Sequence, residues 1–182
     1  MSIRPLTIAA LVAALTAAPL AGAGDLTLIL NAESGDCVAG EHRFGWLDSA
    51  TAGIDANDVP EPPPPLGPYL SAGFRMQGVV SPESWRHDFR AAGDFTARGR
   101  DVWELALTPS SLPANCTVSI TAGVGDPSGL RLRLSGAFAD TLAVPATIAF
   151  PLGSDSRLFI EVFDEALSTE STTLGSAKCL YR

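Results

Sequence analysis

Histidine and cysteine are both scarce in this sequence. Of its 182 residues, only two are histidines, His42 and His87, and only three are cysteines. The chain contains no H-E-x-x-H pair and no G-x-S-x-G turn, which are the spacings of zinc proteases and of α/β-hydrolase nucleophiles. We therefore expect a protein that is not an enzyme. A secreted hydrolase whose site forms only in three dimensions is the less favoured alternative.

Positive charge is also in short supply. The chain has 12 Lys and Arg against 20 Asp and Glu, a formal net charge of -8. Proteins that bind nucleic acids or anionic membranes use basic patches that displace counterions. We therefore expect neither nucleic acid nor a membrane surface as a partner.

Long apolar runs are limited to one, residues 6–20, which lies between Arg4 and the small residues Ala21, Gly22 and Ala23. This arrangement is typical of a secretory signal peptide, and the run is shorter than the roughly 20 residues of a membrane span. We expect residues 1–23 to be cleaved, with an uncleaved anchor as the alternative. Residues 24–182 then form one exported domain, extracellular or on the outer cell surface.

The three cysteines, Cys37, Cys116 and Cys179, all lie in the predicted mature chain. Cys116 alternates with Val118 and Ile120, so we expect it in the core, where a free cysteine behaves as a small apolar residue. Cys37 and Cys179 lie near the two ends of the mature chain and are the better candidates for a disulfide. An intermolecular bridge is the alternative.

Strand periodicity dominates the rest of the sequence. Apolar residues alternate with others near Leu28, Leu105, Val118, Leu132 and Ile160, a pattern typical of strands that pack one face on a core. The helical candidates are short, such as residues 164–167. We predict an all-β fold, an immunoglobulin-like or related two-sheet sandwich, with a small barrel as the alternative.

Six prolines fall in residues 60–68 and favour an extended polyproline II segment. Such a segment can be a semi-rigid spacer, a ligand for a proline-reading module, or a crossover between two sheets. A spacer would leave only about 35 mature residues before it, few for a separate domain. We therefore predict an internal crossover of one domain, which ends in a cysteine-bearing tail, residues 168–182.

The same region resembles a recurring segment of secreted bacterial proteins. Phe44-Gly45, the run from Ala50 to Asp55, and the run from Asp58 to Pro65 follow its approximate pattern, FG-x-ATDGxD-x-x-D-x-PExPPPP, with Ala52 where Asp is usual. There a strand, a D-[IF]-R-x element and a Trp-initiated strand follow; here residues 69–74, 88–91 and 103–107 come in the same order. The resemblance spans roughly residues 26–163 and implies an immunoglobulin-like β-sandwich on the cell surface or outside the cell.

Four carboxylates near the prolines, Asp48, Asp55, Asp58 and Glu61, are candidate calcium ligands because this hard cation takes six to eight oxygens. Their spacing is not that of an EF-hand loop. Asp and Asn also stabilise turns through their own backbone, and we favour that role. No other cofactor is expected.

Trp85 and Arg86 lie in a polar stretch and are candidate ligand-binding residues. An exposed tryptophan beside an arginine can stack on a sugar or a partner side chain, but we favour a Trp85 that is folded back onto the sandwich edge. Trp46 and Trp103 share faces with Phe44 and Leu105 and are expected in the core.

The sequence thus predicts a non-enzymatic module for protein or polysaccharide interaction. In one version of this prediction the module is structural and self-assembles at exposed strand edges. A carbohydrate-binding module that uses Trp85 is the alternative function.

Overall fold

The computed structural model describes residues 24–51, 53–76, 84–112, 114–136, 140–154 and 156–164. The predicted signal peptide and the predicted tail, with Cys179, lie outside these residues. Within them, no helix is long and apolar enough to cross a membrane.

The predicted all-β class is confirmed. The described chain forms eleven strands and one short helix, in the order β1 (Leu26–Ser34), β2 (Cys37–Leu47), β3 (Val59–Pro60), β4 (Leu70–Arg75), β5 (Trp85–Ala91), α1 (Ala92–Arg98), β6 (Arg100–Pro109), β7 (Ala114–Val124), β8 (Leu130–Gly136), β9 (Asp140–Ala143), β10 (Ala146–Leu152) and β11 (Ser156–Asp164). The five predicted periodic segments lie in β1, β6, β7, β8 and β11.

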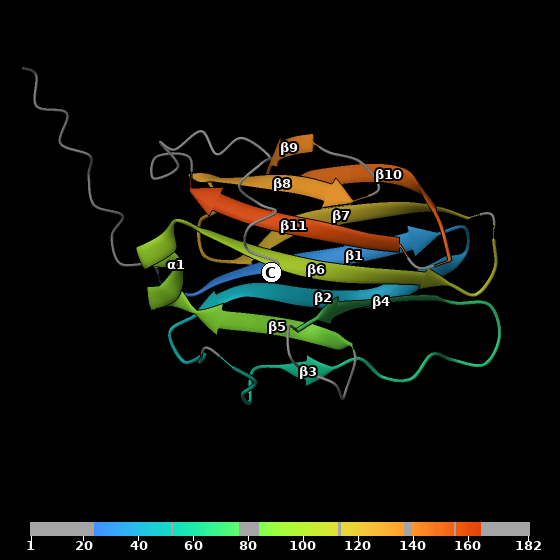
Figure 1. Cartoon of the computed structure of the whole chain (residues 1–182), viewed down its shortest axis with the longest axis horizontal. Coiled ribbons are helices and arrows are strands. Elements are labelled where there is room, and N and C mark those ends of the chain that lie inside the picture. The colour runs from blue at the N-terminus through green and yellow to red at the C-terminus, as the bar shows by residue number, and fades with distance from the viewer. Residues whose placement is uncertain are drawn as a thin grey trace, which may run out of the picture.

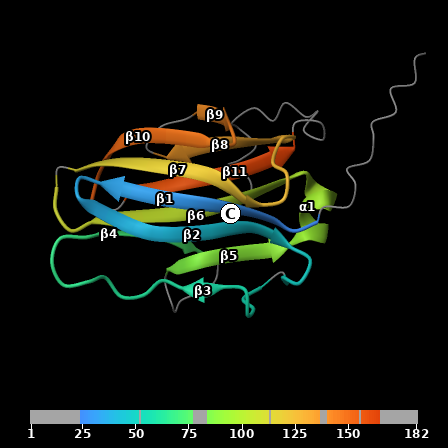
Figure 2. The same ribbon diagram turned by 180° about the vertical axis from the view of Figure 1, so that it is seen from behind.

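Backbone hydrogen bonds join all the strands into one sheet, in the order β10-β7-β1-β2-β5-β4-β6-β11-β8-β9, with β3 attached to β5. The sheet curls so that its two halves face each other. In Figures 1 and 2, β6, β11 and β8 lie over β2, β1 and β7. The two end strands, β9 and β10, come to the same side of the molecule. The sheet is therefore nearly closed.

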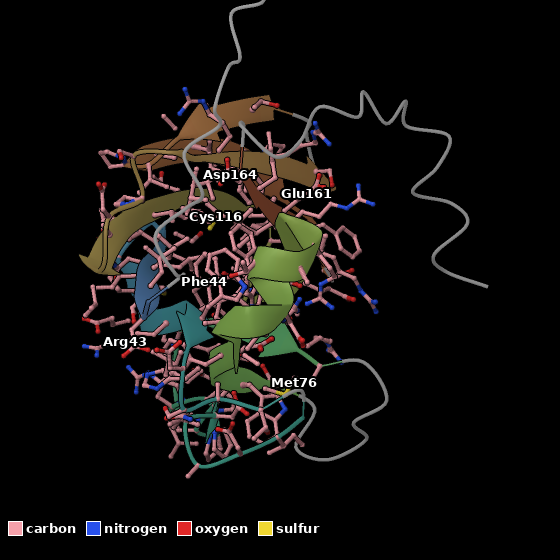
Figure 3. The ribbon with its side chains drawn as sticks, turned by 90° about the vertical axis from the view of Figure 1, so that its left-hand side faces the viewer. Arg43, Phe44, Met76, Cys116, Glu161 and Asp164 are labelled. Atoms are coloured by element: carbon pink, nitrogen blue, oxygen red, sulfur yellow. The ribbon has the colours of Figure 1, made fainter. Side chains whose placement is uncertain are left out.

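The core lies between the two halves and follows the period of two. Phe44 on β2 is fully buried, whereas its neighbour Arg43 points outward (Figure 3). Leu105 and Ile160 from the facing half are also fully buried. Cys116 has no exposed surface, which confirms its predicted place in the core.

The tryptophans 46 and 103 are likewise buried, as predicted. Their rings lie 5.4 Å apart, centroid to centroid, in an edge-on arrangement. Trp46 also packs on Phe95 of α1, with centroids 3.9 Å apart. The aromatic cluster thus fastens the helix to one end of the sheet.

The helix α1, Ala92–Arg98, does not coincide with the helix predicted at residues 164–167. Asp164, the first residue of the predicted short helix, ends β11, and residues 165–167 lie outside the described part. The helix that does form has buried Ala92 and Phe95 one turn apart, and it ends at Gly99, whose φ is 66°. Glycine adopts this left-handed conformation readily. A seven-residue helix carries too short an apolar pattern to stand out against strand periodicity.

Candidate functional site

The sheet has a weak seam where its two halves join. β5 pairs with β2 only from Arg43 to Leu47, and with β4 only through Phe74 and Trp85. Along the described chain, no strand pairs with β2 before Arg43 on the side away from β1. The first half of β2 and the start of β4 therefore flank an opening in the hydrogen-bonded ladder.

The proline-rich segment lies against this opening. A groove of about 300 Å³ separates it from β2 and β4 and is lined by residues 36–40, 61–65, 68–71 and Arg86. Prolines lack the N–H that a ladder needs, so the segment covers the strand edges without extending the sheet. We call this surface, with the adjoining turn after β6, the proline face. It lies at the end of the molecule opposite α1, where the β3–β4 connection loops outward (Figure 1).

Both ends of the proline segment are held by hydrogen bonds. At its start, the Glu61 N–H donates to the carbonyl of Ser84 at 3.0 Å. At its end, the Tyr69 N–H donates to the Ser110 hydroxyl at 2.9 Å, and the Ser110 N–H donates to the Tyr69 carbonyl at 2.9 Å. Between these anchors the prolines restrict the backbone further. The segment is thus a restrained arc rather than a free linker.

His42 bridges the seam from β2. Its Nε2 lies 2.8 Å from the carbonyl of Ala72 on β4 and 3.1 Å from the Glu61 carboxylate. Since a carbonyl can only accept, Nε2 carries the hydrogen. The ring is fully buried, and its Nδ1 has no hydrogen-bond partner among the described residues. His42 is therefore a structural bridge, and it holds the carboxylate of Glu61, a residue that lines the groove.

Arg86, a predicted ligand-binding residue, lies in the groove wall. Its Nε donates to the carbonyl of Glu41 at 3.0 Å. A Cβ added to Gly40 would meet the Arg86 guanidinium at 2.3 Å, so the guanidinium rests on the bare backbone of β2. Arg86 thus caps one unpaired carbonyl of the β2 edge and stays partly exposed.

Cys37 packs partly against the core. It lines the groove and also a second cavity, together with Tyr69, Pro109 and Ser110. Cys37 and Cys116 are both free thiols. They lie on β2 and β7, with β1 between them, so their Cα atoms are about 10 Å apart at normal strand spacing. A disulfide requires less than about 7 Å, so these two cysteines cannot form a bridge. The pairing of Cys37 with Cys179 stays a prediction, because Cys179 lies outside the described residues.

Of the four predicted calcium ligands, Asp55 and Asp58 lie together, whereas Asp48 and Glu61 have other partners. Glu61 bonds to His42, and Asp48 is tied to Asp25 through its own backbone N–H at 2.8 Å. The described residues contain no group of three or more His, Cys, Asp or Glu side chains that could hold a metal ion.

Asp55 and Asp58 instead organise the turn before β3. The Asp55 carboxylate accepts the N–H groups of Thr51 and Asn57 at 2.6 and 2.7 Å. The Asp58 carboxylate accepts the N–H groups of Asp55 and Phe89 at 2.9 and 3.0 Å. The hydrogen bond from Asn57 lowers the pKa of Asp55, whereas burial raises that of Asp58. In these contacts Asp55 and Asp58 stabilise a turn through backbone hydrogen bonds, the role that the sequence analysis favoured.

Trp85 is buried, as the favoured prediction had it, and does not form an exposed aromatic platform. Its side chain is 5 % exposed and lies on β5 opposite Phe74 of β4 and Pro60 of β3. The polar neighbours Ser84 and Arg86 suggested exposure, but in a strand successive side chains point to opposite faces. A sugar therefore has no access to the ring, and Trp85 offers no support for carbohydrate binding.

The structure also contains a buried ionic cluster near α1, which no pattern in the sequence indicated. The Asp101 carboxylate accepts hydrogen bonds from Trp46 Nε1 at 2.7 Å, Arg90 Nη1 at 3.0 Å and Arg98 Nη2 at 2.9 Å. The Arg90 guanidinium lies 4.3 Å from the centre of the Trp103 ring. The Asp88 carboxylate also lies near this arginine, with its Oδ1 3.9 Å from Nε of Arg90. Asp88, Arg90 and Trp103 belong to the elements that carry the resemblance described above, and the structure gives each a packing role.

The carboxylates of this cluster are buried and already paired. Burial raises the pKa of Asp88 to about 6, although Arg90 partly offsets the effect. A raised carboxyl pKa can mark a general acid. However, Asp88 and Asp101 are 5 % and 6 % exposed, and neither lines the groove or the second cavity. Their partners are the arginines and tryptophans that hold α1 on the sheet.

Comparison of the chain with known protein families, characterised proteins and solved structures found no match. The candidate site therefore rests on its geometry. The proline face combines Cys37, Glu61 and Arg86, which the sequence had assigned to three unrelated roles, with the exposed proline segment. Local sequence patterns could not show that these residues lie together, since 49 positions separate Cys37 from Arg86.

Proposed function

We propose that this chain is a non-enzymatic, exported β-sandwich module, immunoglobulin-like or related, that binds a protein or polysaccharide partner at the cell surface. The facing halves of the curled sheet support the sandwich assignment. Export rests on the apolar start of the sequence, and the resemblance to secreted bacterial proteins supports a surface location.

The observation that carries the proposal is the proline face. It joins a groove of about 300 Å³ to a restrained, solvent-exposed proline segment, whereas the buried carboxylates near α1 are occupied by arginines. Concave surfaces with a few polar groups are the usual places for recognition. Interaction surfaces also lose less entropy on binding when they are already rigid, and both ends of this segment are anchored.

Protection of Cys37 from alkylation tests the proposal directly. Cys37 lines the groove, whereas the second described thiol, Cys116, is fully buried, and burial raises its pKa to about 11. Thiolates are the reactive species, so a maleimide reagent applied to a reduced Cys179→Ser chain should label Cys37 first. A panel of soluble polysaccharides and purified extracellular proteins is then screened for slower labelling.

We expect at least one partner to slow labelling roughly tenfold near saturation, and Arg86→Glu to weaken that protection. Turnover of a hydrolase substrate by the chain, abolished in a carboxylate variant, would overturn the proposal. Labelling that no partner affects would equally count against the groove as the binding surface.

A further inference from the structure

Exposed apolar side chains gather at the proline face. Leu66, in the middle of the proline segment, is 105 % exposed, and Val38 on the groove wall is 62 % exposed. Leu112, in the turn after β6, is 51 % exposed, and its neighbours Ser110 and Ser111 line the second cavity with Cys37. The prolines 62–65 are exposed as well. Apolar groups gathered on one surface in this way mark an interaction site.

The same surface carries both a projection and a hollow. Leu66 projects from the restrained arc, and beside the arc lies the groove, with Val38, Tyr69 and the prolines in its lining. A leucine side chain is far smaller than this groove. Two copies related by a two-fold axis can therefore each insert Leu66 into the groove of the other, the self-complementary arrangement that a symmetric dimer requires.

We propose that the proline face is the contact between two copies of this chain. This inference rests on the proposed function, because it names the partner of the same surface. The restrained arc favours such a contact, since little chain freedom remains to be lost on association.

The charge distribution permits two copies to meet here. The net charge of -8 opposes association of identical chains. Among the residues that line the groove and the second cavity, only Asp36, Glu61 and Arg86 are charged. Glu61 bonds to His42 and Arg86 to the β2 edge. The proline face is thus close to neutral, and added salt should strengthen the dimer by screening the remaining repulsion.

Sedimentation velocity of the purified, reduced Cys179→Ser chain tests the inference, because this variant excludes a disulfide-linked dimer. We expect a monomer–dimer equilibrium with a dissociation constant in the micromolar range, about 1 to 100 µM. Leu66→Ser should raise that constant at least roughly tenfold, since it removes a buried leucine. The matched control is Ile54→Ser, on the loop before β3, which is 49 % exposed in the native chain and should leave the equilibrium unchanged.

The alkylation rate of Cys37 supplies a second readout. It should fall as the protein concentration passes through the dissociation constant, and Leu66→Ser should abolish that fall. A chain that stays monomeric at roughly 200 µM overturns the inference, as does a dimer that Leu66→Ser leaves intact. A monomer whose Cys37 is protected by another partner overturns the dimer and leaves the proposed function standing.

Discussion

Asp101 is the residue on which the helical end of the molecule depends. Three donors, from Trp46, Arg90 and Arg98, converge on its carboxylate, which is almost fully buried. Such a charge is costly to bury unless it is paired, and removal of one partner leaves the others unsatisfied.

We expect Asp101→Asn to lower the free energy of unfolding by about 2 to 4 kcal/mol in urea titrations. Glu161→Gln is the matched control, because Glu161 forms a 2.9 Å pair with Arg133, which is 48 % exposed. Surface pairs contribute only about 0 to 1 kcal/mol. Similar losses in the two variants would contradict a structural role for the Asp101 cluster.

Asp88 gives the fold a defined pH dependence. Burial raises its pKa from 3.8 to about 6 in the folded chain. The unfolded chain therefore releases this proton first, and the contribution of Asp88 to stability is complete below pH 4 and is lost as the pH rises through 6.

Asp88→Asn removes this titration. We expect the stability of the variant, relative to the native chain, to rise by about 2 to 3 kcal/mol between pH 4 and pH 7. Urea unfolding at several pH values measures the difference. A difference that does not change with pH would show that Asp88 is ionised equally easily in the folded and unfolded chains.

At the scale of elements, two glycines differ in whether a larger side chain could replace them. Gly45 on β2 has a φ of 139°, and an added Cβ would lie 2.1 Å from the Leu26 carbonyl oxygen of β1. Gly93 lies in α1, and an added Cβ would meet no atom within 4 Å.

The same substitution should therefore have opposite effects at the two sites. Gly45→Ala forces β1 and β2 apart, and we expect it to cost about 3 kcal/mol or more. Gly93→Ala should stabilise the chain by about 0.5 to 1 kcal/mol through helix propensity. Thermal unfolding of both variants measures this, and loss of stability in Gly93→Ala would contradict the described helix.

Backbone N–H donors hold the turn before β3. Because Asp55 and Asp58 already accept N–H groups, we expect EDTA and millimolar calcium to leave the melting temperature unchanged within about 1 °C. Differential scanning calorimetry tests this. A ligand that binds only the folded state raises its stability, so a calcium-dependent rise of several degrees would restore the calcium site.

The positions of β1, β6, β7, β8 and β11 were predictable from the sequence because each of these strands packs one face on the core, and side chains that alternate between two faces give the sequence a period of two. The helix α1 was not, since its seven residues bury only Ala92 and Phe95. The burial of Trp85 was the favoured prediction, but the sequence did not show which residues cover it. Its polar neighbours point to the other face of β5, and its burial depends on β3 and β4, elements distant in the chain.

At the scale of the whole molecule, the curled sheet determines what the proline segment does. The sequence allowed a spacer, a ligand or a crossover. In the fold the segment runs from β3 to β4, and it faces strand edges that β5 leaves unpaired. It therefore shields those edges and at the same time presents Leu66 to solvent.

The sequence by itself determined the all-β class, the positions of five strands, the core places of Trp46, Trp103 and Cys116, and the acidic charge balance. These depend on composition and on neighbours two positions apart. Only the tertiary structure decided the groove, the Asp101 cluster and the strands that cover Trp85. Each of these joins residues far apart in the chain, as Trp46 and Asp101 are at 55 positions. Which strand edges meet follows from the topology of the sheet, and no local pattern encodes it.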